Sequence, residues 1–123
     1  MSSHELLYKA IKIATKAHKK QTDKYGAPYL GHVFRVMNAG KTIDEKIVGA
    51  LHDVVEDVPD YDFAYLREKG FPEHIIFAVD CLTKRDNEET DYDAFVQRTE
   101  QSSLAIAVKL NDLRDNMDLT RLP

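Results

Sequence analysis

Apolar residues recur every three to four positions along most of this sequence, which is the spacing of one face of an α-helix. The pattern is clear near the N-terminus, where Leu6, Ala10, Ile11 and Ala14 fall on one side of a predicted helix. No stretch alternates apolar and polar residues for long, and the sequence contains no Asn-Gly or Asp-Gly pair of the kind typical of β-hairpins. The sequence therefore predicts an all-α fold.

Capping residues, glycines and prolines divide this pattern into about six to seven helices, which should pack as a single-domain helical bundle. We expect helices over residues 3–21, 30–39, 43–57, 62–69, 73–83, 91–101 and 103–117. Ser2 or Ser3 should cap the first of these helices, Thr42 the third, and Ser102 or Ser103 the last. The polar segment 84–90 is expected to be a loop.

Composition narrows the classes of protein that this chain can represent. The formal net charge of −4 disfavours duplex nucleic acid as a partner, because proteins that bind it present a broad basic surface. No apolar run reaches the roughly 20 residues of a membrane span, and the N-terminus lacks the apolar stretch of a secretory signal. The single cysteine, Cys81, excludes a disulfide within the chain. We therefore expect one cytoplasmic domain over residues 1–123, with no membrane partner.

Basic residues gather in the N-terminal third of the chain. Five lysines follow helical spacing there: Lys9, Lys12, Lys16, Lys19 and Lys20. The sequence leaves two interpretations of them open. They form either a solvated helix face or an electrostatic collar for a small polyanion.

In three segments, a run of apolar residues is followed by side chains of the kind that bind metal ions. The strongest is His52-Asp53, which lies on a predicted helix with apolar flanks and is followed one turn later by Glu56 and Asp57. Polar groups in such a setting are costly unless they are paired or bind an ion. Another segment supplies His32 near the N-terminus.

The third segment supplies Asp112, where an apolar helix suddenly turns acidic. Each of these residues, taken alone, is what the polar surface of a helix normally carries. Taken together, they predict a site for one divalent cation. His32, His52, Asp53 and Asp112 are its expected ligands, because imidazole and carboxylate suit a hard or borderline ion. These ligand types do not exclude Fe, Mg, Zn or Ni.

The order of these residues resembles that of the HD-domain metal phosphohydrolases. The closer resemblance is to the RelA/SpoT-type hydrolase domain, which removes pyrophosphate from the 3′ position of the alarmone ppGpp. Residues 17–32 (AHKKQTDKYGAPYLGH) resemble its opening motif, AH-x-x-Q…K-x-G-x-PYI-x-H. Residues 52–57 (HDVVED) match HD-x-x-ED, and residues 109–117 (KLNDLRDNM) resemble KLADRLHNM. The resemblance implies a bundle of the HD-domain type, the four metal ligands named above, and Mn²⁺ as the usual ion.

A divalent ion in this site would lower the pKa of a bound water and neutralise charge on a phosphoryl group. Glu56 and Asp57 are the expected catalytic residues, because they are placed to orient or deprotonate that water. Lys24 can take a phosphate oxygen, Tyr25 can stack on a base, and Asn116 can contact ribose or base. We therefore predict a metal-dependent enzyme that resembles a guanosine-3′,5′-bis(diphosphate) 3′-pyrophosphohydrolase.

Asp23 keeps other functions open, because the resembled family usually has an arginine just before the lysine of this loop. One alternative is a phosphatase or nucleotidase that acts on another small phosphate ester. The other is a nucleotide-sensing HD domain without turnover, which the complete ligand set disfavours. If the substrate is ppGpp, Asp23 is expected to turn outward, toward Lys19, Lys20 or Lys24. The partner is a small phosphorylated molecule in each case, and the sequence does not specify an oligomeric state.

Overall fold

The computed structural model describes residues 1–85 and 92–118, and every regular element in these two ranges is a helix. The helices in chain order are α1 (Ser3–Ala17), α2 (Tyr29–Ala39), α3 (Ile43–Leu51), α4 (Val54–Asp57), α5 (Phe63–Glu68), α6 (Glu73–Leu82), α7 (Tyr92–Thr99) and α8 (Ser103–Asn116). The all-α prediction is confirmed. The predicted number of helices also agrees, if α3 and the single turn α4 are taken as the one helix expected over residues 43–57. None of the described helices is long and apolar enough to cross a membrane.

Three of the predicted helix starts depend on capping residues, and the structure confirms these three. The hydroxyl groups of Ser2, Thr42 and Ser102 each accept a hydrogen bond from the backbone N–H three residues further on, at 3.0–3.1 Å. The first helix is shorter than predicted, because it ends at Ala17 with His18 as its C-cap. Most of the predicted loop 84–90 lies outside the described residues.

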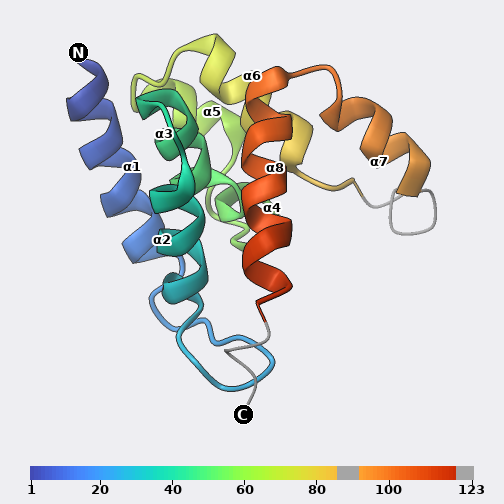
Figure 1. Cartoon of the computed structure of the whole chain (residues 1–123). Helices are drawn as coiled ribbons and strands as arrows, with labels where there is room; N and C mark the ends of the chain where they lie inside the picture. The colour runs from blue at the N-terminus through green and yellow to red at the C-terminus, as the bar shows by residue number, and fades with distance from the viewer. Residues whose placement is uncertain (86–91, 119–123) are drawn as a thin grey trace.

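Helix α3 occupies the centre of the bundle and contacts α1, α2, α6 and α8 (Figure 1). Helices α2 and α8, which are far apart in the sequence, lie side by side against it (Figure 1). The central position follows from the composition of α3, whose residues Ile47 to Leu51 are all buried. The C-terminal end of α3 therefore meets α2 and α8 at one end of the bundle.

Leu51 is the last residue of α3 and is fully buried in the shared hydrophobic core. We expect Leu51→Ala to lower the free energy of unfolding by about 2–5 kcal/mol, because it removes buried apolar surface and leaves a cavity. Denaturant unfolding monitored by circular dichroism measures this change. A loss below about 0.5 kcal/mol, the usual range of surface substitutions, would contradict the central position of α3.

The segment between α1 and α2 folds back on itself. The N–H of Asp23 donates to the carbonyl of Ala27 at 2.8 Å, and the N–H of Tyr29 donates to the carbonyl of Gln21 at 2.9 Å. Gly26 has a φ of +84°, a conformation that glycine adopts without the strain that a side chain brings. The bond from Tyr29 places Gln21 beside the start of α2. The α1–α2 loop lies at the lower end of the bundle in Figure 1.

Candidate metal centre

Four side chains from three separate parts of the chain converge at the end of α3. They are His32 on α2, His52 and Asp53 directly after α3, and Asp112 on α8. Each offers one ligand atom, and these atoms all lie within 4.8 Å of one another. The structure thus brings together all four predicted ligands, in a group that could hold a metal ion.

A break in the predicted helix 43–57 explains how His52 and Asp53 both face this point. In a continuous helix, adjacent residues diverge by about 100°. Here α3 ends at Leu51, and Asp53 leaves helical geometry with φ −110° and ψ 0° before α4 begins. As a result, Oδ2 of Asp53 lies 2.9 Å from Nε2 of His52.

Both histidines present the same nitrogen to the site. Nδ1 of His52 lies 2.6 Å from the carbonyl oxygen of Gly49, which can only accept a hydrogen bond, so Nδ1 carries the proton. Nδ1 of His32 lies 2.6 Å from Oδ2 of Asp115, which likewise accepts. The Nε2 atoms of both rings therefore point toward the acidic ligands, as metal-binding imidazoles require.

Nε2 of His52 is buried and makes no hydrogen bond to any residue that the structure describes, although it lies 2.9 Å from one oxygen of Asp53 and 3.6 Å from one of Asp112. A ring nitrogen that lies close to two carboxylates without a hydrogen bond to either marks a position that a cation can take. This orphaned atom, together with the donor set, is what a site for a divalent ion would show.

The electrostatics of the cluster also favour positive charge at this point. Burial alone would lower the pKa of His52, but the nearby charges of Asp53 and Asp112 raise the pKa to about 10. Burial would likewise lower the pKa of His32, whereas its bonds to Asp112 and Asp115 raise it. The carboxylates therefore attract either protons or a metal ion, and metal binding is expected to release protons.

Asp112 occupies the middle of the cluster. Its Oδ1 atom lies 2.8 Å from Nε2 of His32, and its Oδ2 atom accepts a hydrogen bond from Nζ of Lys109 at 3.2 Å. Burial would raise the pKa of this carboxyl group, but the bond to His32 and the nearby His52 ring lower it well below its usual value. Asp112 is thus a carboxylate at any ordinary pH and available as a ligand.

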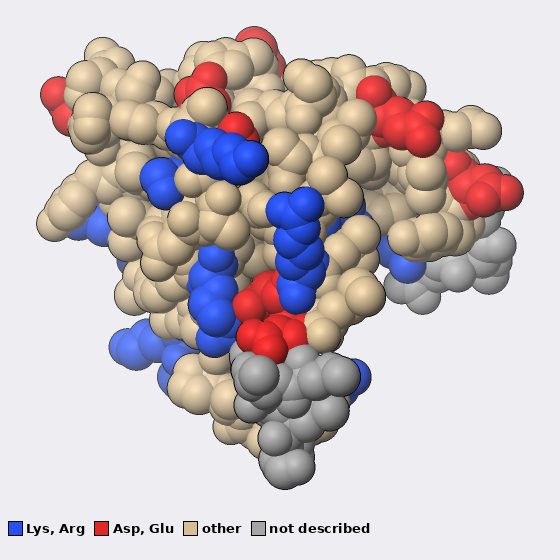
Figure 2. Space-filling view, in the orientation of Figure 1, with Lys and Arg blue, Asp and Glu red and all other residues tan. Residues whose placement is uncertain are grey.

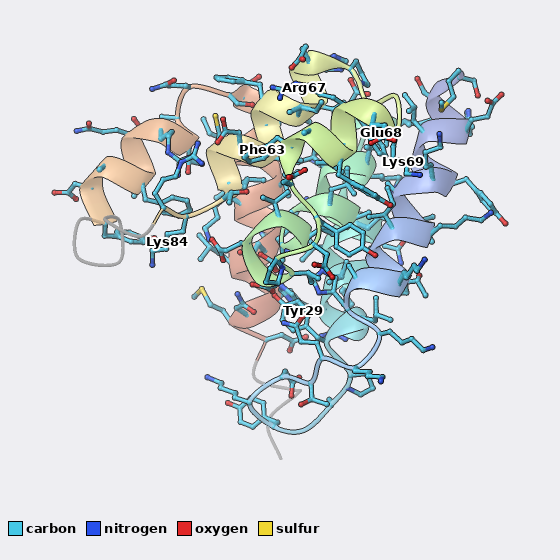
Figure 3. The ribbon with its side chains drawn as sticks, turned by 180° about the vertical axis from the view of Figure 1, so that it is seen from behind. Tyr29, Phe63, Arg67, Glu68, Lys69 and Lys84 are labelled. Carbon is cyan, nitrogen blue, oxygen red and sulfur yellow. The ribbon has the colours of Figure 1, made fainter. Side chains whose placement is uncertain are left out.

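Tyr29 supports the site from below, between α4 and the α1–α2 loop (Figure 3). Its hydroxyl group donates to Oδ2 of Asp53, and its ring lies 5.3 Å from the rings of both His18 and His32. Burial and the charge of Asp53 raise the pKa of the hydroxyl group, so it remains a donor. Tyr29 therefore fixes the orientation of Asp53.

We expect Tyr29→Phe to weaken metal binding by roughly 10–100-fold, the usual cost of removing a partner of a ligand. The phenylalanine ring keeps the packing against the two histidines, so the melting temperature should change little. Competition with a chromophoric chelator measures the metal affinity. An affinity within twofold of the wild-type value would show that the hydroxyl group does not hold Asp53.

A cavity of about 200 Å³ opens beside the four ligands. Its wall includes His52, Asp53 and Asp112, the predicted catalytic residue Glu56, and the predicted substrate-binding residue Asn116. Asn116 also donates a long hydrogen bond of 3.4 Å from Nδ2 to Oδ1 of Asp112.

Two lysines also line the cavity, and neither was predicted to do so. Lys84 stands where the chain leaves α6 toward α7 (Figure 3), and Lys109 lies one turn before Asp112 on α8. The cavity thus combines acidic ligands with cationic groups that could bind an anion.

Glu56 is tied to the segment that follows α6. Its Oε1 atom accepts a hydrogen bond from the backbone N–H of Lys84 at 2.6 Å. Burial raises the pKa of the Glu56 carboxyl group, and the charges of Asp53 and Asp57 raise it further. A carboxylate with a raised pKa is a stronger base than an ordinary glutamate, which suits proton transfer from water.

Asp57 does not line the cavity but is held by a chain of hydrogen bonds beside it. Nδ1 of His18 lies 2.8 Å from Oε1 of Gln21, and Nε2 of Gln21 donates to Oδ2 of Asp57 at 3.1 Å. Burial and the charge of Asp53 raise the pKa of the Asp57 carboxyl group. His18 and Gln21 therefore support one of the two predicted catalytic acids.

Lys24 and Tyr25 are exposed on the α1–α2 loop and are not among the described residues that line the cavity. Nζ of Lys24 lies 5.3 Å from the centre of the Tyr25 ring, so the two side chains contact each other. Among the described residues, Asp23 makes no ion pair with Lys19, Lys20 or Lys24, the partners expected for it. Its Oδ1 atom accepts hydrogen bonds from the backbone N–H groups of Tyr25 and Ala27, at 2.9 and 3.0 Å, and so stabilises the turn.

The four ligands could be predicted from the sequence, because they are polar residues that interrupt apolar helical patterns. The residues that support them follow less distinctive patterns. Asp115 and Lys109 lie three residues on either side of Asp112, a spacing that places them near it on one helix. Lys84 had no such signal, since it reaches the cavity only through the packing of α6 against α8. A comparison of the sequence with protein-family models finds no match.

Proposed function

We propose that this protein is a metal-dependent phosphohydrolase, and that its substrate is a nucleotide of the ppGpp type. The observation that carries the proposal is the juxtaposition of the four-residue ligand cluster with a cavity that holds one carboxylate base and two lysines. Hydrolysis of a phosphate ester needs these components: a cation, a group that takes a proton from water, and positive charges for the phosphate oxygens.

His32, His52, Asp53 and Asp112 would hold the ion, with Mn²⁺ as the proposed species. When bound, a divalent ion lowers the pKa of a coordinated water and neutralises charge on the phosphoryl group under attack. The donor set fits it, because both Nε2 atoms and the carboxylates of Asp53 and Asp112 face one point.

The residues of the chain carry the proton and the phosphate. Glu56 takes a proton from the attacking water as the new bond from oxygen to phosphorus forms. The bond from phosphorus to the ester oxygen breaks, and the departing oxygen takes up the proton that Glu56 has received. Lys84 and Lys109 bind the phosphate oxygens at the cavity wall, and Asn116 contacts the nucleoside part at its edge.

The size of the cavity favours a second candidate, a phosphatase acting on a smaller phosphate ester. The cavity of about 200 Å³ is smaller than the roughly 300–1,000 Å³ of sites that enclose a drug-sized ligand. Lys24 and Tyr25, which were predicted to bind the nucleotide, lie outside it. A ppGpp-type substrate would therefore place one phosphate end in the cavity and leave the nucleoside near the surface.

The test is incubation of the purified protein with Mn²⁺ and a panel of nucleotides that includes ppGpp, with separate assays for pyrophosphate and phosphate. Release of pyrophosphate from ppGpp supports the proposal. Release of phosphate from a smaller ester, with ppGpp left intact, supports the second candidate. Binding of nucleotide without any product would overturn both and indicate a sensing domain. Asp112→Asn serves as the negative control in every assay.

A further inference from the structure

His32 is held on both sides of its ring, and only one side faces the other ligands. Nε2 lies 2.8 Å from Asp112, whereas Nδ1 lies 2.6 Å from Oδ2 of Asp115. The Asp115 side chain is largely buried, with 10% of its surface exposed. A buried carboxylate that accepts the Nδ1 proton sets the plane of the ring and makes Nε2 the nitrogen that faces an ion.

Arg35 binds the other oxygen of the Asp115 carboxylate. Its Nε atom donates to Oδ1 of Asp115 at 2.7 Å, so the two oxygens of Asp115 have different partners. Arg35 lies one turn after His32 on α2, and Asp115 lies one turn after Asp112 on α8. Where α2 and α8 run side by side, Figure 2 shows acidic atoms emerging between groups of lysine and arginine atoms.

The residue before His32 allows this arrangement. A Cβ atom at Gly31 would lie 3.0 Å from Nη1 of Arg35, which is closer than nearly all real contacts of that kind. The missing side chain therefore leaves room for the guanidinium group over the first turns of α2. The same contacts lower the pKa of Asp115, because the bonds from Arg35 and His32 outweigh the effect of burial.

The second imidazole ligand is supported differently. Nδ1 of His52 donates to the backbone carbonyl of Gly49, a neutral acceptor in its own helix. A carboxylate acceptor makes an imidazole more electron-rich than a carbonyl acceptor does, and so makes it a stronger metal ligand. The two histidines are thus unequal, and the difference lies in Asp115.

We propose that Asp115 is a positioning residue of the metal centre, which holds His32 in its metal-binding form, and that Arg35 acts only through Asp115. This inference rests on the proposed metal site. It does not follow from the family resemblance, because the motif KLADRLHNM has histidine at the position of Asp115.

The experiment compares Mn²⁺ affinity among Asp115→Asn, Arg35→Gln and the double variant, by competition with a chelator. We expect Asp115→Asn to weaken binding by roughly 10–100-fold, because asparagine keeps the shape and an acceptor oxygen but loses the charge. Arg35→Gln should have a smaller effect, and the double variant should match Asp115→Asn. Asp44→Asn is the matched control, since Asp44 pairs with His74 on an exposed surface.

Two results would overturn the inference. One is an affinity of Asp115→Asn within twofold of the wild-type value at an unchanged melting temperature. The other is additive effects of the two substitutions, which would give Arg35 a role of its own. Melting temperatures of all three variants are measured alongside, because two residues in contact are non-additive in stability as well.

Proton NMR of the metal-free protein separates this inference from the proposed function. The Nδ1 proton of His32 should resonate far downfield, as in short bonds to carboxylate, and should move upfield in Asp115→Asn. If the wild-type protein binds no metal, the proposed function fails, while this signal still shows whether Asp115 holds the ring. An unchanged resonance in Asp115→Asn would overturn the inference whatever the metal affinity.

Discussion

Asp112→Asn is expected to reduce Mn²⁺ affinity by more than about 100-fold, beyond the roughly 10–100-fold cost of losing a mere partner of a ligand. Asp112 lies between both imidazoles, 2.8 Å from His32 and 3.6 Å from His52. The substitution removes the negative charge that a cation needs, so hydrolytic activity should fall with metal affinity. Isothermal titration calorimetry measures the affinity, and released phosphate or pyrophosphate measures the activity.

The asparagine variant should still fold. Its amide group can donate to the Nε2 atom of a neutral histidine, which replaces the contact that the carboxylate made. Asp44→Asn makes the same chemical change at an exposed Asp–His pair and should leave metal binding intact. Wild-type affinity in Asp112→Asn would remove this residue from the metal centre and with it the proposed site.

Glu56→Gln is expected to keep the metal and to lower kcat by about 10²–10⁴-fold, the usual contribution of a general base. The glutamine oxygen can still accept the hydrogen bond from the N–H of Lys84, so the segment after α6 stays in place. The substitution therefore removes the base and little else. Steady-state kinetics together with the metal titration separate these effects.

The comparison with Asp57→Asn decides which acid takes the proton. Asp57 accepts a hydrogen bond from Gln21 and does not line the cavity, so its loss should affect kcat less than that of Glu56. A larger effect of Asp57→Asn would assign the proton transfer to Asp57. Loss of metal in Glu56→Gln would instead show that Glu56 supports the ligands, and full activity would exclude it from the mechanism.

The backbone hydrogen bonds of Asp23 decide which substitution tests the role of its charge. An arginine in place of Asp23 would reverse the charge at this position and favour an anionic substrate. The structure shows that Asp23 accepts two backbone hydrogen bonds within its turn, so arginine would disturb the loop as well as the charge. Asp23→Asn, which keeps an acceptor oxygen, is the cleaner probe of charge.

The sequence by itself determined the helical class, the capped helix starts and the four side chains that could hold a metal ion. Helix starts depend on residues that are close in the chain, as the cap bonds of Ser2, Thr42 and Ser102 show. These side chains could be predicted because a charged group in a buried helix is costly unless it is paired or binds an ion. Asp112, which is buried in α8, is an example.

Only the tertiary structure decided where helix 43–57 breaks and which residues complete the site. The contacts from Gln21 to Asp57, from Glu56 to Lys84 and from His32 to Asp115 join residues 36, 28 and 83 positions apart. No local pattern contains them, because they arise only when segments that are far apart in the sequence pack together, as α2 and α8 do for His32 and Asp115. The helices depend on interactions between residues that are close in the sequence. The hydrogen-bond partners of the four candidate ligands depend on how distant segments pack.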